Sequence, residues 1–284
     1  MNRNLPIGIF DSGVGGLTVY RALHERLPDE HFVYLGDTAR VPYGTKSLTT
    51  VERYAVENSK FLEAHGIKLL VVACNTASAL ALPAIRKAVS VEVIGVIEPG
   101  ARAGIEMAKG KSIGVIATEA AVESEAYRHA IAQVDPDREV IERACPLFVS
   151  LAEEGWAQTD VARLVAAQYL SEFRKYDIGA LVLGCTHYPI LSGVINDEVG
   201  SHIPLIDSGE ATAVEVRSLL ESRGLSRDRG EPRYRERQLC DDLDHFYVTD
   251  AAQRFARVAE RFLGSAPSVL EAVEVWGHDE LRTY

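Results

Sequence analysis

Two cysteines lie in similar short segments, one in each half of the chain. The segments are Ala73-Cys74-Asn75-Thr76 and Gly184-Cys185-Thr186-His187. Each follows a run of aliphatic residues that is typical of a buried strand. A thiol directly after a strand lies at the carboxyl edge of its sheet, where open α/β sheets bind ligands. One thiol on each face of a substrate could remove a proton from one face of a carbon and deliver a proton to the other. The pattern therefore predicts a proton-transfer site with two thiols.

Other interpretations of these cysteines stay open from the residues alone. A single cysteine after a strand is more often a small core residue than a nucleophile. Cys145 and Cys240 lack the matched context, and we expect them to be structural. Cys185 and His187 could also form an acyl-transfer pair, and a two-lobed chain could bind an amino acid without catalysis. Zinc sites usually contain closely spaced cysteine pairs, which this sequence lacks, so we expect no metal.

Composition restricts the class of protein. The chain has 284 residues, which is enough for one large or two ordinary domains, and its 47% hydrophobic content is typical of a globular protein. No apolar run approaches the roughly 18–20 residues of a membrane span, and the first residues do not resemble a secretory signal. Four dispersed cysteines indicate a reducing compartment, and a formal charge of −11 disfavours nucleic acid and anionic membranes as partners. We expect a soluble, cytoplasmic protein.

Short apolar runs alternate with helical patterns along the chain. The expected strands are 7–10, 32–35, 69–73, 93–97, 113–117, 140–143, 181–184 and 203–206, and 246–248 belongs to a further element near the end of the chain. The expected helices include 48–65, 160–176, 211–222 and 251–263. This alternation predicts an α/β fold whose doubly wound parallel sheets are covered by helices on both faces. The arginine-rich segment 223–237 is expected to be an exposed loop.

The chain also contains an internal repeat. Three landmarks of the first half recur in the second half, in the same order and at a nearly constant offset. The matched pairs are 7–10 with 113–116, Cys74 with Cys185, and 96–100 with 205–209. The repeat predicts two similar α/β units that meet near residue 98.

Two loops after expected strands could contact a ligand. The loop 11–16 is rich in glycine and precedes a helical pattern, but Thr18 replaces the last glycine of a dinucleotide fingerprint and no Walker lysine follows. Its backbone N–H groups could still hold an anion at a helix N-terminus. Asp11 at its start either caps that helix or acts as an acid or base. The second loop, 37–44, presents the hydroxyl of Tyr43.

Together these segments resemble the glutamate racemase family. The resemblance rests on Asp11-Ser12-Gly13-Val14-Gly15-Gly16-Leu17, Pro42-Tyr43-Gly44, Cys74-Asn75-Thr76-Ala77, Pro146-Leu147-Phe148-Val149 with Glu153-Glu154-Gly155, and Gly184-Cys185-Thr186-His187-Tyr188-Pro189. It extends from residue 7 to about residue 264. Members of this family act without a cofactor and supply D-glutamate for bacterial peptidoglycan synthesis. Aspartate and hydantoin racemases share the paired cysteines but not the full set of motifs, so an aspartate racemase or a related amino-acid racemase is the alternative.

The resemblance implies an architecture. Two α/β domains face each other about a pseudo-twofold axis, and the active site lies in the cleft between them. We expect residues 1–97 with 211–284 to form the first domain, to which the end of the chain returns, and 98–210 to form the second. The expected partner is the substrate, L- or D-glutamate, and a homodimer stays open as the assembly.

The resemblance also implies roles for individual residues. Cys74 would act on D-glutamate with the help of Asp11, and Cys185 would act on L-glutamate with the help of His187 and Glu153. The expected substrate-binding residues are Ser12, Pro42, Tyr43, Gly44, Asn75, Thr76, Thr118 and Thr186. Of these, Ser12, Tyr43 and Gly44 would hold the side-chain carboxylate, and Asn75, Thr76 and Thr186 the amino-acid head group.

Two features of the motifs bear on the chemistry. Arg40 is the one lysine or arginine within them, so we expect recognition by backbone N–H groups and by serine, threonine, asparagine and tyrosine side chains. The family usually has a second threonine where this chain has Ala121, so one donor to the head group is expected to be lost. A free thiol has a pKa near 8.5, and lowering it to about 7 requires roughly 2 kcal/mol, or an adjacent base such as Asp11 or His187.

Overall fold

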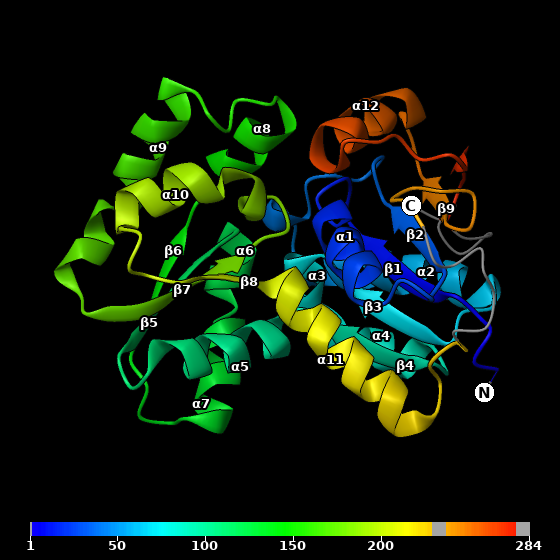
Figure 1. Ribbon diagram of the computed structural model, residues 1–284, viewed down its shortest axis with the longest axis horizontal. Helices are drawn as coiled ribbons and strands as arrows, with labels where there is room; N and C mark the ends of the chain where they lie inside the picture. Colours follow the sequence, from blue (N-terminus) through cyan, green and yellow to red (C-terminus); the bar gives the residue numbers. More distant parts are fainter. Residues whose placement is uncertain (1, 229–236, 277–284) are drawn as a thin grey trace.

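The computed structural model describes residues 2–228 and 237–276. It contains two parallel sheets, each at the centre of an α/β layer arrangement (Figure 1). The first sheet contains β1 (Ile7–Asp11), β2 (Phe32–Gly36), β3 (Leu69–Val72), β4 (Glu92–Gly95), β9 (His245–Val248) and β10 (Leu270–Ala272). The second contains β5 (Ser112–Ala117), β6 (Val140–Ala144), β7 (Ile178–Gly184) and β8 (Leu205–Asp207). The predicted fold class is confirmed.

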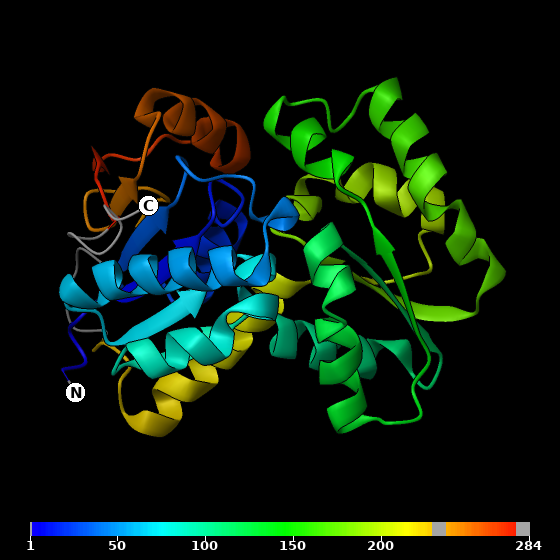
Figure 2. The same ribbon diagram turned by 180° about the vertical axis from the view of Figure 1, so that it is seen from behind.

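Helices cover both faces of each sheet. They are α1 (Leu17–Arg26), α2 (Leu48–Ala64), α3 (Asn75–Leu80), α4 (Leu82–Ala88), α5 (Ile97–Ala108), α6 (Glu119–Glu123), α7 (Ala126–Val134), α8 (Leu147–Glu153), α9 (Asp160–Leu170), α10 (Ser192–Val199), α11 (Ser208–Arg223) and α12 (Ala252–Leu263), with short 3₁₀ turns η1 (Tyr43–Thr45), η2 (Ser171–Lys175) and η3 (Tyr188–Leu191). Figure 2 shows α2 and α4, in light blue to cyan, over one face of the first sheet, while α1 covers the other. Because both faces are covered, the central strands are continuous apolar runs and every residue of β1 is buried.

The two sheets repeat one strand order. The first runs β10-β9-β2-β1-β3-β4 and the second β6-β5-β7-β8, so the first four strands of each unit are arranged identically. All neighbouring strands are parallel. The strand order reverses at β1, which pairs with β2 on one side and β3 on the other, and in the same way at β5, which pairs with β6 and β7. This topology matches the internal repeat in the sequence.

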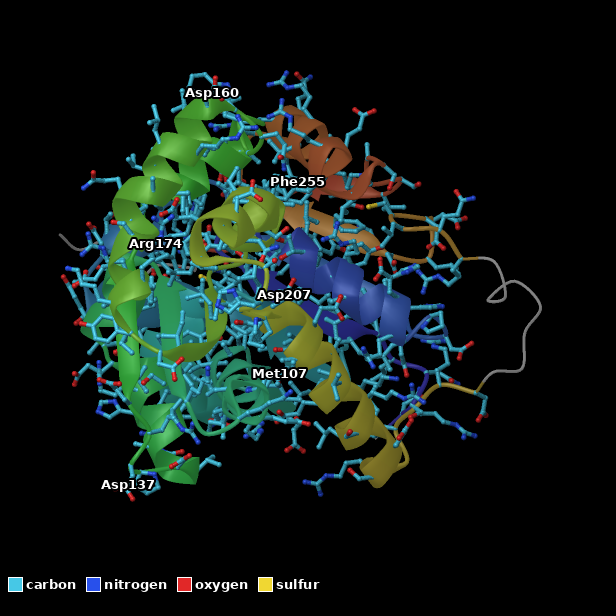
Figure 3. The ribbon with its side chains drawn as sticks, turned by 60° about the vertical axis from the view of Figure 1, so that its left-hand side comes forward. Met107, Asp137, Asp160, Arg174, Asp207 and Phe255 are labelled. Carbon is cyan, nitrogen blue, oxygen red and sulfur yellow. The ribbon has the colours of Figure 1, made fainter. Side chains whose placement is uncertain are left out.

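Two helices cross between the units. After β4 of the first sheet, α5 packs against β7 and α7 of the second unit, and after β8 of the second sheet, α11 packs against α1 of the first. Figure 3 shows α11 running from Asp207 along α1. The side chain of Asp207 caps α11 by accepting from Gly209 N at 2.7 Å. We propose domains of 1–97 with 211–284 and of 98–210; this division is supported by the pairing of β9 with β2.

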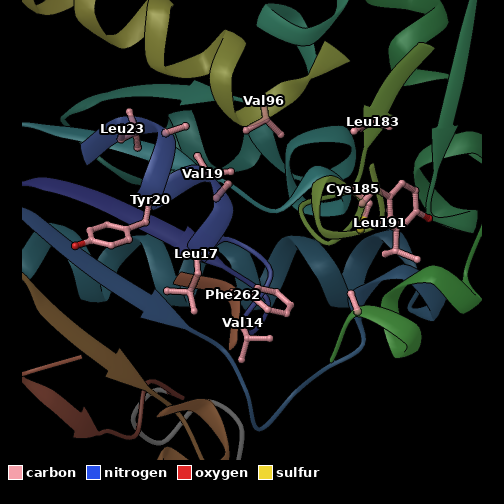
Figure 4. Packing of buried hydrophobic residues seen from close by; sticks show 14 of the residues in the cluster. Val14, Leu17, Val19, Tyr20, Leu23, Val96, Leu183, Cys185, Leu191 and Phe262 are labelled. Carbon is pink, nitrogen blue, oxygen red and sulfur yellow. The ribbon is translucent and has the colours of Figure 1, made fainter. Parts of the chain in front are cut away.

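The apolar core is continuous between the two units. One cluster of buried residues joins Leu17 and Val19 of α1 to Leu183 of β7 and Leu191 after it (Figure 4). Phe262 of α12 belongs to the same cluster. A shared core of this kind limits how far the domains can move apart, because separation would expose apolar surface to water.

Two local predictions are wrong. The strand expected at 93–97 ends at Gly95, the last residue paired with β3, because Val96 N instead donates to Ser78 Oγ at 3.2 Å. The segment 223–237 was expected to be exposed, but the Arg237 side chain is buried and pairs with Asp244 at 2.6 Å. Residues 229–236 of that segment lie outside the described residues. A buried guanidinium needs such a carboxylate partner, and Asp244, a little further along the chain, supplies it.

None of the helices in the described part of the chain has the length and apolar character that a membrane crossing requires.

A buried ion pair provides a test of this fold. Lys68, which precedes β3, is fully buried and pairs with Glu30; its ammonium also donates to the carbonyls of Arg3 at 2.8 Å and Leu225 at 2.9 Å. Lys68→Met would leave the Glu30 carboxylate buried without its cation, so we expect the free energy of unfolding to fall by about 3–5 kcal/mol. Urea denaturation measures this, with exposed Lys60→Met as the control, expected within about 0.5 kcal/mol of wild type. Equal midpoints for the two variants would contradict this role.

Candidate active site

The carboxyl ends of the central strands of both sheets meet at one cavity. β1 and β3 of the first sheet, and β5 and β7 of the second, flank the points where strand order reverses, which is where open sheets bind ligands. The cavity has a volume of about 490 Å³ including its open mouth. Its lining is Ser12, Gly13, Val41, Pro42, Tyr43, Gly44, Cys74, Asn75, Thr76, Thr118, Val149, Glu153, Cys185, Thr186 and His187.

This lining contains every site residue predicted from the sequence except Asp11, which is buried at the end of β1. Three lining residues, Gly13, Val41 and Val149, were not predicted individually. Gly13 and Val149 lie inside motifs that the sequence analysis used, and Val41 precedes Pro42. An apolar side chain carries no chemical signal in a sequence, so only the fold could place Val41 and Val149 at the cavity.

The first thiol lies against an acid. Cys74 begins α3, where its sulfur accepts from Ala77 N at 3.5 Å, and its thiol donates to Ser12 Oγ at 3.3 Å. Burial, assisted by the neighbouring charge of Asp11, raises the pKa of Cys74 to about 12. The thiol is therefore protonated near neutral pH and is suited to donate a proton.

Asp11 is a buried carboxyl group with spare capacity to accept hydrogen bonds. Its Oδ2 accepts from Gly13 N at 2.8 Å, whereas Oδ1 has no hydrogen-bond partner among the described residues. The side chain makes no cap bond to α1, so the capping interpretation is not supported. Burial raises the pKa of Asp11, although the charge of His187 opposes the shift. A carboxylate that is more basic than usual thus lies beside the Cys74 thiol.

The second thiol lies in a different environment. His187 Nδ1 is 3.8 Å from Cys185 Sγ, and His187 Nε2 is 3.1 Å from Glu153 Oε1. Burial disfavours the charged imidazole, but the hydrogen bonds to Cys185 and Glu153 raise the pKa of His187 to about 10. The hydrogen bond with His187 in turn lowers the pKa of Glu153. Glu153 thereby orients the ring so that Nδ1 can exchange a proton with the thiol.

Polar groups of the cavity wall leave an acceptor for a ligand. Asn75 Nδ2 donates to the Tyr127 hydroxyl at 2.9 Å, and that hydroxyl is 2.8 Å from Ser208 Oγ. Asn75 Oδ1 is buried without a hydrogen-bond partner in the described structure. A buried acceptor costs free energy until a donor reaches it, and an ammonium group would supply one. Across the domain boundary, the hydroxyls of Thr76 and Thr118 lie 2.9 Å apart.

Tyr43 differs from its predicted role as a hydroxyl donor to a ligand. Its hydroxyl donates to Asp37 and accepts from Asn58 Nδ2 at 3.1 Å. Asp37 is fully buried and also accepts from Thr249 Oγ1 at 2.9 Å and from Arg40 Nε at 2.7 Å. The phenol therefore holds the loop that contributes Pro42, Tyr43 and Gly44 to the cavity lining.

The glycine loop contacts the second domain. A Cβ atom at Gly15 would lie 2.2 Å from Thr186 Oγ1 and 2.5 Å from the His187 ring, so only glycine permits this approach. The neighbouring Thr18 Oγ1 donates to the Thr186 carbonyl at 2.8 Å. The predicted anion-binding role is not supported at Gly15, because protein atoms already occupy the space over it.

Three further predictions concern a second threonine, basic side chains and metal ligands. Ala121, where the family usually has threonine, is fully buried in the core of the second domain and lies outside the cavity lining. Among the described residues, that lining includes no lysine or arginine. No group of three or more potential metal ligands occurs within 2–228 and 237–276.

The sequence and the fold match one group of enzymes. The family model for Asp/Glu/hydantoin racemases matches residues 7–216. A glutamate racemase of Geobacter metallireducens is 50% identical over 258 residues, which are 91% of this chain and 92% of that protein. A glutamate racemase of Chlorobium phaeobacteroides is 47% identical, over 95% of this chain and 96% of that protein.

Solved structures agree with this match. A glutamate racemase from Bacillus anthracis superposes with a TM-score of 0.89 at 38% identity, covering 96% of this chain and 98% of that one. The enzyme from Francisella tularensis, solved in complex with D-glutamate, gives 0.87 at 39% identity with the same coverage. An aspartate racemase from Picrophilus torridus shares the fold at 21% identity and a TM-score of 0.53, covering 81% of this chain and 98% of that one. The chain therefore belongs to the glutamate racemase family, within the larger family of aspartate, glutamate and hydantoin racemases.

Proposed function

We propose that this protein interconverts L- and D-glutamate by moving a proton between the two faces of Cα, with Cys74 and Cys185 as the acid and base. The observation that carries the proposal is that both thiols, from matching strand ends of the two domains, line one cavity. The aspartate alternative is supported by a likeness in fold alone. In a bacterial cytoplasm this reaction would supply D-glutamate for peptidoglycan synthesis.

The resemblance to the family suggests which thiol acts on which enantiomer, and the surroundings of each thiol support the base proposed for it. From L-glutamate, Cys185 takes the α-proton as a thiolate after His187 has accepted the thiol proton, which is the usual activation of a cysteine by an adjacent base. The electron pair of the broken C–H bond stays on Cα, and the Cys74 thiol protonates the opposite face. From D-glutamate the steps reverse, and Asp11 is the base that receives the proton of Cys74.

Binding groups lower the energy of the carbanion. We propose that Ser12 and the main-chain N–H groups of Tyr43 and Gly44, in the loop that follows Pro42, hold the side-chain carboxylate. The proposed contacts for the head group are Asn75, Thr76, Thr118 and Thr186. Because the α-hydrogen is a very weak acid, the donors at the head group must bind the α-carboxylate more strongly as negative charge develops on it. A fixed cation would stabilise the charge at one position and compete for the thiolates, which fits the absence of lysine and arginine from the described lining.

Solvent deuterium tests the two-base mechanism. In D₂O without added cofactor, either enantiomer should become racemic, and the newly formed enantiomer should carry one deuterium at Cα. The reason is that each thiol exchanges its proton with water between turnovers. Circular dichroism follows the racemisation and proton NMR follows the loss of the Cα signal. Inversion with full retention of the Cα proton would overturn the mechanism.

Removing either thiol should abolish racemisation. Cys74→Ala and Cys185→Ala each remove the only acid or base on one face of Cα, and such groups typically contribute about 10²–10⁴-fold. Cys240→Ala is the matched control, because Cys240 is buried outside the cavity and should leave the rate unchanged. Activity of either single variant close to that of the control would contradict the assignment.

Mixing the two inactive variants tests whether the site is built within one chain. Both thiols line the same cavity of one chain, so every cavity in a refolded mixture of Cys74→Ala and Cys185→Ala still lacks one thiol. We therefore expect no recovery of racemisation when the mixture is followed by circular dichroism. A substantial recovery would mean that two chains share each site.

A further inference from the structure

The helix α12 touches the active site from outside the cavity. It belongs to the segment that returns to the first domain, whereas α8, whose last residue is Glu153, belongs to the second unit. Figure 1 shows α12 (orange) and α8 (green) at the same end of the molecule, on opposite sides of the domain boundary. The contacts between them join the two domains at Glu153.

Two arginines of α12 hold Glu153. Arg254 Nη2 donates to Glu153 Oε2 at 3.2 Å, and Arg261 Nη1 donates to the Glu153 main-chain carbonyl. The two arginines are two helical turns apart and so lie on one face of α12. Phe262 of the same helix places its ring edge-on to His187, with the centroids 6.0 Å apart.

The two oxygens of the Glu153 carboxylate have separate partners. Oε1 receives the hydrogen bond of His187 Nε2, and Oε2 receives that of Arg254. A carboxylate held at one oxygen can turn about its terminal bond, whereas a carboxylate held at both oxygens has a defined plane. The Glu153 side chain is 25% exposed, so water would compete for it if Arg254 were absent.

We propose that Arg254 is a positioning residue for the second thiol: by fixing Glu153, it keeps His187 Nδ1 directed at Cys185. The inference rests on the proposed racemase function. Arg254 does not line the cavity and does not touch the reacting atoms. It acts through Glu153 and His187, and its effect falls on the proton transfers at Cys185 and not on those at Cys74.

A matched pair of variants tests the effect on rate. Arg254→Ala should lower kcat/KM about tenfold, the scale of one lost hydrogen bond between charged groups. Arg257→Ala removes the same charge from an exposed position of the same helix and should change kcat/KM less than twofold. Arg254→Lys, which keeps the charge, should recover part of the loss. Equal rates for Arg254→Ala and Arg257→Ala would overturn the inference.

A double variant separates positioning from a general structural role. If Arg254 acts through the Glu153 carboxylate, adding Arg254→Ala to Glu153→Gln should cause no further loss of kcat/KM. A structural defect would add to the loss, and additivity would therefore overturn the inference. Urea unfolding of each variant confirms that the folded protein is compared.

Isotope effects locate the affected step. Slowing proton transfer at Cys185 makes that step more rate-limiting in both directions. In Arg254→Ala the deuterium isotope effect on kcat/KM should therefore rise for 2-deutero-L-glutamate and fall for 2-deutero-D-glutamate. An unchanged ratio of the two effects would overturn the inference while leaving the racemase function intact. A wild-type protein that racemises neither enantiomer would overturn the proposed function itself.

Discussion

The site depends on the close approach of two sheets at their carboxyl ends. A proton donor and a proton acceptor must reach opposite faces of one carbon, so the strand ends of the two domains must face one small cavity. The contact between Gly15 and the Thr186–His187 segment is part of this approach, because a Cβ atom at Gly15 would overlap Thr186 Oγ1 and the His187 ring. The continuous apolar core and the crossing helices α5 and α11 hold the domains in that position.

Both thiols are buried, and their neighbours differentiate them. Burial raises the pKa of Cys74 and of Asp11, which keeps a protonated thiol beside a carboxylate that is more basic than usual. Around Cys185 the hydrogen bonds to His187 outweigh burial and favour the charged imidazole. The internal repeat thus provides two equivalent positions, and different neighbours give them different proton chemistry. Racemisation without a cofactor needs both thiols, since a proton must leave one face of Cα and another must reach the opposite face.

Charge outside the cavity supports the chemistry inside it. Asp37 is a buried carboxylate that holds Tyr43 and Arg40, and so it fixes a loop that lines the cavity. On the opposite wall, Glu153 lies between His187 and Arg254. In both places a cation is used to orient a carboxylate, and the cavity lining among the described residues stays free of lysine and arginine.

The sequence by itself determined the fold class and the position of most strands, because apolar runs that alternate with helical patterns leave few other arrangements. It also identified the lining of the site closely, since the thiols, amides and hydroxyls follow directly after strands and parallel strand ends meet at one edge. Only the tertiary structure decided which polar side chains pair with one another and which are left to contact a ligand. Tyr43 has its hydroxyl turned to Asp37, Arg237 is buried against Asp244, and Arg254 reaches Glu153 from a helix about a hundred residues further along the chain. Arg254 and Glu153 are 101 residues apart, and the nearer pairs carry no local signal either, because burial and charge balance are properties of the folded chain.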